Sequence, residues 1–275
     1  MCFVSSAERV GRIGHGQLIG TPLTLGLLGA TGAGHLAVPP HRRFTLGTLR
    51  LELIPTGRGF GAAGLHVDLV GRTTLYAGPV RAPDAEVRAC DAVVVAAPYG
   101  ELAFPPLADV VAQVSAWASA QLAAGKKPVL VVDSVIDGLE VASLLAPLAI
   151  TGSRALREAA ARMEGLAPVP VVRGPSREPM VTIRVEDTDR AKLVDQVTAL
   201  VSGRALAGHA GHAAGFAWAS ASGRTHLLGW IESTNAREVY VTGAAAESIV
   251  AALGPRARLL GPPHQMTLFP REAAR

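Results

Sequence analysis

The sequence predicts a layered α/β protein with parallel strands at its centre. Residues 91–165 alternate apolar strands with segments of helical spacing, an order typical of parallel sheets with right-handed crossovers. The run at 93–96 is wholly apolar, so we expect this strand to be covered on both faces. Earlier runs alternate apolar and polar residues, which predicts strands with one solvated face.

The N-terminal third is predicted to hold strands around one short helix. Thr21 suits the N-cap of this helix and Pro22 its first turn. A glycine-rich turn at 57–64 separates two of the alternating runs, and Gly71 marks a hairpin. The strands expected in this part cover residues 2–5, 49–54, 65–70 and 73–77.

Strands and helices are expected to alternate through the rest of the chain. Val110, Val114 and Trp117 recur at helical spacing, and Gly125 ends their helix. The strands are expected at 93–96, 128–132, 147–153, 179–187, 215–219, 238–243 and 257–261. The helices are expected at 107–125, 137–147, 154–164, 188–203, 225–234 and 244–254.

The order of these elements divides the chain into parts. Residues 1–90 and 206–261 are predicted to form one domain, into which the α/β unit 91–205 is inserted. Residues 262–275 form a C-terminal tail.

Composition indicates a globular protein of a reducing compartment. The 275 residues are 49% hydrophobic, enough for a large core, and the net charge of +4 is compatible with nucleic-acid contact. Cys2 and Cys90 form no disulfide framework, and no signal peptide is visible, so we expect a cytoplasmic protein. Gly and Pro interrupt the apolar stretch 18–38, which argues against a membrane span.

Several short stretches occur in a characteristic order. They are "CFVSSAERVGRIGHGQLIGTPLT", "PTGRGFGAA", "YAGP", "VAAPYG", "GFAWASASGRTHLLGWI" and "VYVTGA". Their order resembles the metallo-β-lactamase-fold nucleases of the β-CASP group, which include exonucleases associated with DNA ligase and mRNA 3′-end processing factors. The resemblance implies an abbreviated metallo-β-lactamase αββα sandwich with an inserted β-CASP-like α/β domain. Because only Met1–Val4 precede the first motif, it also implies either that N-terminal strands of the sandwich are missing or that the true start codon lies upstream.

The metal-ligand positions of that family do not carry ligands here. The positions of the first motif fall on Ser6, Glu8, Val10 and Gly11. The later positions fall on Arg58, Pro79, Ser220, Ala221 and Gly243. In the insert, the strand-end Glu position falls on Ala96 and the His position on Thr151.

This set of residues is unsuited to a two-metal hydrolase. Such a site needs imidazoles and carboxylates around two cations, and only Glu8 of the first nine positions offers one. Arg58 would bring a permanent positive charge to the place of the cations. We therefore expect no metal, no cofactor and no catalytic residue, and a pseudoenzyme in place of a nuclease.

Two groups of residues are candidates for binding partners. Arg9, Arg12, Arg58 and Arg224 would cluster near the vacated metal site and could hold the phosphates of a nucleic acid. The tail motif "QMTLF" resembles the pentapeptide with which bacterial repair proteins bind the sliding clamp. Its binding residues would be Gln265, Met266, Leu268 and Phe269, with a terminal strand of the core as the alternative.

Other motifs are weaker candidates. His209 and His212 could bind a metal only on a helix, and their glycine-rich surroundings favour a loop. Asp133 and Ser134 follow a predicted parallel strand, where α/β sheets place binding sites. His66, between two apolar residues of a strand, is expected to be a surface or packing residue.

Three functions remain open from the sequence. The first is a non-catalytic binding or structural subunit in nucleic-acid processing or repair, paired with an active paralogue. The second is an active metal-dependent nuclease completed by residual ligands or by a partner. The third is a standalone adaptor for nucleic acid or the sliding clamp.

Overall fold

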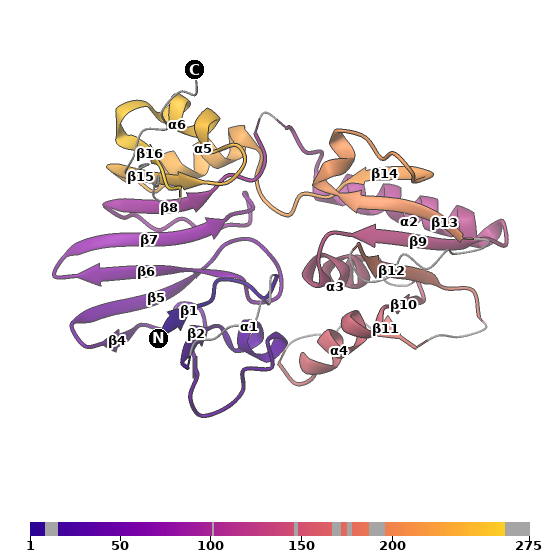
Figure 1. Cartoon of the computed structure of the whole chain (residues 1–275), viewed down its shortest axis with the longest axis horizontal. Helices are drawn as coiled ribbons and strands as arrows, with labels where there is room; N and C mark the ends of the chain where they lie inside the picture. Colours follow the sequence, from indigo (N-terminus) through magenta and orange to yellow (C-terminus); the bar gives the residue numbers. More distant parts are fainter. Residues whose placement is uncertain are drawn as a thin grey trace, which may run out of the picture.

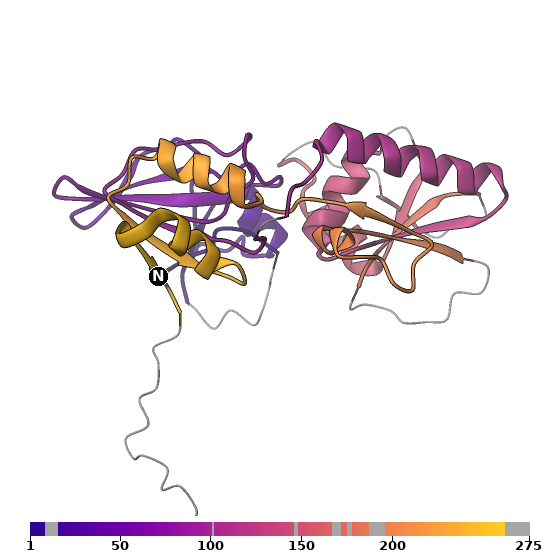
Figure 2. The ribbon, with the colours of Figure 1, turned by 90° about the horizontal axis from the view of Figure 1, so that it is seen from above.

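Two large sheets lie side by side, each with its own helices, in the computed structural model of the chain (Figure 1). The structure describes residues 1–8, 16–100, 102–145, 148–166, 172–174, 178–186 and 196–261. It confirms the general α/β class predicted from the sequence. Two connections, 97–106 and 218–223, join the two lobes (Figure 2).

The first lobe contains a seven-stranded sheet in the order β16-β15-β8-β7-β6-β5-β4. Strands β4 to β7 are antiparallel, whereas β7, β8, β15 and β16 are parallel neighbours. The strands are β4 (Phe44–Leu46), β5 (Leu49–Pro55), β6 (Ala63–Leu69), β7 (Arg72–Pro79), β8 (Ala92–Ala96), β15 (Glu238–Thr242) and β16 (Ala257–Leu259).

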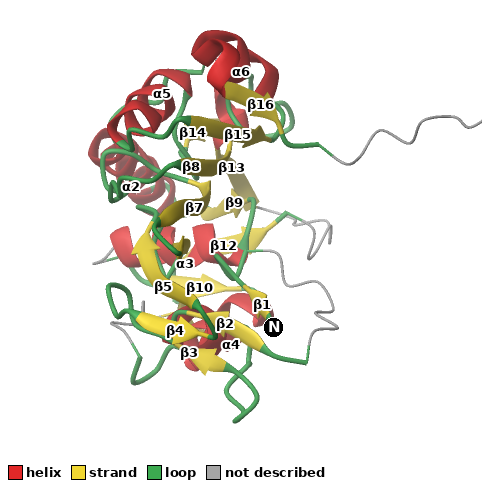
Figure 3. Cartoon of the chain, turned by 90° about the vertical axis from the view of Figure 1, so that its left-hand side faces the viewer, coloured by secondary structure: helices red, strands yellow, loops and turns green. Residues whose placement is uncertain are grey.

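Two helices, α5 (Arg224–Ser233) and α6 (Ala246–Leu253), also belong to this lobe. Figure 3 shows α6 beside β15 and β16, and α5 contacts α6. Leu227 and Ile231 of α5 and Ile249 of α6 pack with Val93 and Val239 in one buried apolar cluster. The helices therefore cover one face of the sheet at its β8–β15 end.

A three-stranded parallel sheet and one helix also belong to the N-terminal segment. They are β1 (Cys2–Phe3), β2 (Leu18–Gly20), β3 (Leu36–Ala37) and α1 (Pro22–Leu27). Thr21 caps α1 as predicted, because its hydroxyl accepts a hydrogen bond from Thr24 N at 3.1 Å. Ile19 packs against Leu53, which joins this sheet to the other face of the seven-stranded one.

The second lobe contains a six-stranded parallel sheet in the order β11-β10-β12-β9-β13-β14. Its strands are β9 (Lys127–Val132), β10 (Ile150–Gly152), β11 (Val172–Arg173), β12 (Val181–Val185), β13 (Gln196–Ser202) and β14 (Ala214–Ala217). Its helices are α2 (Leu107–Ala123), α3 (Val135–Leu144) and α4 (Arg154–Arg162), and a short 3₁₀ turn, Gly203–Leu206, follows β13. A second 3₁₀ turn, Gly254–Arg256, lies in the first lobe between α6 and β16. Among the described residues, no helix is long and apolar enough to cross a membrane.

The structure corrects two predictions about this part of the chain. The helix expected at 188–203 is wrong where the structure describes it, since residues 196–202 form β13 between β9 and β14. A short apolar run such as "VTALV" fits either type of element, and pairing with a strand on each side decides it.

The second correction concerns the domain boundaries. The sequence predicts that the inserted unit begins at residue 91 and ends at residue 205, but the strands at these two ends belong to other sheets than predicted. Strand β8 pairs with β7 and β15 in the first sheet, and β14 pairs with β13 in the second. The chain thus changes lobe after β8 and again after β14.

Candidate functional site

The strand ends that face the second lobe hold three of the positions at which the resemblance predicts metal ligands, namely Pro79, Ala96 and Gly243 (Figure 1). Pro79 at the end of β7 pairs with Ala96 at the end of β8, which pairs with Thr242 at the end of β15. Gly243 follows with φ +104°, and a Cβ there would lie 2.8 Å from the carbonyl oxygen of Ala97. A histidine side chain at 243 is therefore incompatible with this backbone.

The connection 218–223 lies across these strand ends. Ser222 N donates to Val80 O at 2.8 Å, and the Ser222 hydroxyl accepts from Ala82 N at 2.7 Å. The hydroxyl groups of Ser220 and Tyr99 are 2.7 Å apart, and burial raises the pKa of Tyr99. Ser220 therefore links the two connections, and Ala221 beside it is buried.

Arg58 lies in the loop after β5 and is buried between the lobes. Its side chain is 5% exposed and forms ion pairs with Glu8 and with Asp137, at 3.2 Å from Asp137 Oδ1. Asp137 belongs to α3 and also accepts a hydrogen bond of 2.6 Å from the Ser134 hydroxyl. Burial lowers the pKa of Arg58 and raises that of Asp137, and in each case the opposite charge of the partner counteracts burial.

A second buried pair lies beside the first. Arg81 donates to both carboxylate oxygens of Glu140, at 2.9 and 2.5 Å, and its Nε donates to Gly57 O at 3.1 Å. Trp218 Nε1 also donates to Glu140, at 3.2 Å. Burial alone would lower the pKa of Arg81, but its hydrogen bonds and charge interaction with Glu140 raise it.

Together these pairs form a junction network of five charged residues. Two arginines of the first lobe meet two carboxylates of α3, and Glu8 adds a third carboxylate. The members of the network are Glu8, Arg58, Arg81, Asp137 and Glu140. Each carboxylate has a guanidinium partner, so the network stabilises the contact between the lobes at a fixed geometry.

The residues of the junction do not fit a two-metal centre. Arg58 brings a buried guanidinium to the place where cations would bind, and Glu8 is neutralised by it. Gly243 leaves no space for a larger side chain. Among the residues that the structure describes, no group of three or more His, Cys, Asp or Glu is placed to hold a metal ion.

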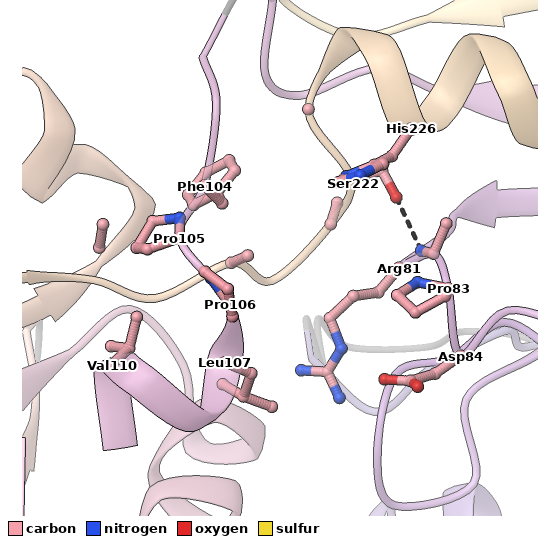
Figure 4. A pocket seen from close by; sticks show the side chains of 15 residues that line it. Arg81, Pro83, Asp84, Phe104, Pro105, Pro106, Leu107, Val110, Ser222 and His226 are labelled. Carbon is pink, nitrogen blue, oxygen red and sulfur yellow. Dashed lines mark hydrogen bonds between the residues drawn. The ribbon is translucent and has the colours of Figure 1, made fainter. Parts of the chain in front are cut away.

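A pocket of about 280 Å³ opens beside the junction network (Figure 4). Phe104, Pro105 and Leu107 form its apolar wall, and Arg81 and Asp84 lie on the opposite side. The pocket is therefore an amphipathic cleft between the two lobes, at the edge of the junction network.

The structure places the predicted nucleic-acid residues in different environments. The prediction is wrong for Arg58, because its buried guanidinium is already paired with two carboxylates. Arg224 is half-buried at the first residue of α5, and its backbone N donates to Gly100 O at 3.0 Å. Arg9, Val10, Gly11, Arg12 and the tail residues Gln265, Met266, Leu268 and Phe269 lie outside the described residues.

The weaker candidates mostly have structural contacts. Asp133 pairs with Arg204 at 2.6 Å and accepts from the Ser202 hydroxyl, and Ser134 caps α3. His209 and His212 lie in a loop, where Nδ1 of His209 is 3.1 Å from His212 O.

Arg81, Asp137, Glu140 and Trp218 are not among the candidate site residues predicted from the sequence. One signal was present: Asp137 and Glu140 are three residues apart on an otherwise apolar helix and therefore share a face. Carboxylates on a buried face require positive partners.

No model of a known protein family and no curated protein matches this chain. Among solved structures, the chain is similar to one described as a protein of unknown function from Enterococcus faecalis V583. The TM-score is 0.63 at 9% sequence identity, and the match covers 94% of this chain and 78% of that one. This likeness concerns the fold alone.

Proposed function

We propose that this chain is a non-catalytic relative of the metallo-β-lactamase-fold β-CASP nucleases. In this proposal the first lobe is an abbreviated αββα sandwich and the second a β-CASP-like insert. The chain serves as a binding or structural subunit in cytoplasmic nucleic-acid processing or repair, beside an active paralogue.

The observation that carries the proposal is the burial of Arg58 in the junction network. A nuclease of this group would need metal ions and an open cleft at the lobe junction. Here a guanidinium with 5% exposed side chain pairs with Glu8 and with Asp137 of the other lobe. The order of the sequence motifs supports the family assignment, and the filled junction supports the loss of catalysis.

Metal analysis of the purified chain tests the loss of catalysis. Elemental analysis should find far less than one zinc or manganese per chain. DNA and RNA, single- and double-stranded, should remain uncut with added manganese. Stoichiometric metal together with nuclease activity that a chelator abolishes would overturn the proposal in favour of an active enzyme.

Co-purification from the source cells tests the role as a subunit. A tagged chain should retain a nuclease of the same fold that has intact metal ligands. Retention of the sliding clamp alone, lost in Phe269→Ala, would favour the adaptor hypothesis instead. A chain that elutes as a monomer with neither partner would contradict both.

A further inference from the structure

A second pocket, of about 270 Å³, lies on the seven-stranded sheet away from the lobe junction. Most of the side chains that line it are charged or titratable. The residues that line it are Arg43, Arg50, Leu51, Glu52, His66, Asp68, Thr73, Arg88 and Ala89.

The strand register places this pocket on the helix-covered face of the sheet. Glu52 pairs with His66, and His66 pairs with Leu75, so the three side chains share one face. Leu75 belongs to the core beneath α5 and α6. The pocket therefore occupies the part of this face toward β4, beyond the two helices.

Positive charge exceeds negative charge in the pocket, and its carboxylates are already engaged. Glu52 is 6% exposed and accepts from Arg88 at 2.5 Å and from Arg43 at 3.3 Å. Asp68 accepts from Gly71 N at 2.8 Å within the hairpin turn. Arg50 is exposed and has no ion pair with a described residue.

Two buried nitrogen atoms of the pocket have no hydrogen-bond partner among the described residues. They are Arg88 Nε and His66 Nε2. A buried guanidinium N–H without an acceptor is costly. A rotation of the partly exposed Arg88 side chain toward the pocket would give this N–H an oxyanion as acceptor, in a charge-assisted hydrogen bond. His66 would become a second donor when protonated.

We propose that this pocket binds a phosphate group through Arg43, Arg50 and Arg88, with His66 protonated in the complex. The inference does not depend on the proposed function, because the pocket lies outside the junction. Inorganic phosphate and the phosphate of a nucleotide or nucleic-acid end share the required chemistry.

Binding of an oxyanion should be pH-dependent. Burial, followed by the charge of Arg88, lowers the pKa of His66, although Glu52, a hydrogen bond with the backbone of Ala89 and Asp68 act in the opposite direction. The anion must therefore overcome this lowering to hold the imidazole protonated. Arg43 and Arg50 are the other charged groups of the pocket. An anion favours the protonated imidazole, so binding takes up a proton and strengthens as the pH falls.

Calorimetric titration of the whole chain tests the site with sulfate, inorganic phosphate and a 5′-phosphorylated trinucleotide. Arg50→Gln should weaken binding about tenfold, the loss expected for one hydrogen bond to a charged group. Arg42→Gln is the control, because Arg42 is exposed in the turn before β4 and does not line the pocket. Sulfate, whose charge is constant, should bind more tightly at pH 5.5 than at pH 8, and His66→Asn should remove this difference.

The outcomes distinguish a general oxyanion site, a site for nucleic-acid ends, and the absence of a phosphate site. Equal binding of all three probes identifies a general oxyanion site. Binding of the trinucleotide alone, lost on dephosphorylation and in Arg50→Gln, assigns the site to nucleic-acid ends. No binding of any probe, or unchanged binding in Arg50→Gln, overturns the proposal.

Discussion

Arg58 is buried and Arg81 is half-buried, and each pairs with a carboxylate of α3 in the other lobe. Such pairs contribute little relative to apolar residues, but each partner becomes costly when the other is removed. Asp137 is 4% exposed and depends on Arg58 for its counter-charge. Substitutions in the junction network should therefore change the free energy of unfolding strongly, and substitutions in surface ion pairs should change it weakly.

Replacing Arg58 with methionine should lower the free energy of unfolding by about 3 kcal/mol or more, because Asp137 is left unpaired. Urea denaturation measures this loss. Arg72→Met is the control, since the Arg72–Glu238 pair is exposed and should contribute less than about 1 kcal/mol. The double variant Arg58→Met/Asp137→Leu should recover part of the loss; a double variant less stable than Arg58→Met would contradict the interpretation.

Asp91 should make the free energy of unfolding depend on pH in the acid range. Its Oδ2 accepts from Thr73 N at 2.8 Å and from the Thr73 hydroxyl at 3.0 Å, and these bonds lower the pKa of Asp91. A depressed carboxyl pKa stabilises the fold above the ordinary value near 4, and this contribution is lost as the pH falls through the folded-state pKa. The stability difference between wild type and Asp91→Asn should therefore shrink between pH 6 and pH 2.5 in urea titrations. A difference that is constant with pH would argue against it.

At the scale of elements, α3 supplies both carboxylates of the second lobe to the junction. Its N-cap, Ser134, accepts from Asp137 N at 3.1 Å and donates to the Asp137 carboxylate at 2.6 Å. The same side chain therefore begins the helix and orients a member of the junction network.

Ser134→Ala should cost more than the equivalent change at the N-cap of α4. Ser153 only accepts from Leu156 N, at 3.3 Å, so Ser153→Ala should cost about 1 kcal/mol. Ser134→Ala should cost about 2 kcal/mol, because a buried carboxylate also loses a donor. Thermal and urea unfolding of the two variants compares them, and equal losses would show that the bond to Asp137 contributes nothing.

At the scale of the whole molecule, two lobes with separate cores are joined by two connections and one buried network. Trp218 lies in one connection, is 1% exposed and donates to Glu140. The network should couple the unfolding of the two lobes.

Urea unfolding followed by tryptophan fluorescence and by far-UV circular dichroism should give coincident transitions for the wild type. Glu140→Ala removes the partner of Arg81 and should separate the two transitions or lower the apparent m-value. Glu158→Ala, in the exposed pair with Arg154, should leave them coincident. Two separate transitions in the wild type would contradict the coupling.

Much of the fold could be predicted where the local pattern is unambiguous. The alternating run at 65–70 became β6, and the periodic run around Val110 and Val114 became α2. The run at 197–201 became a strand because β9 and β14 pair with it on both sides, which the residues themselves do not reveal. The change of lobe after β8 likewise depends on which strands β8 meets.

The sequence by itself determined the element types of the periodic segments and the absence of metal-ligand side chains at Arg58, Pro79, Ala221 and Gly243. Only the tertiary structure decided what Arg58 contacts, because its partner Asp137 is 79 positions away along the chain. Arg81 and Glu140 are 59 positions apart. Ion pairs across a lobe junction depend on the approach of two surfaces and on the burial that it causes, and neither is encoded in local spacing.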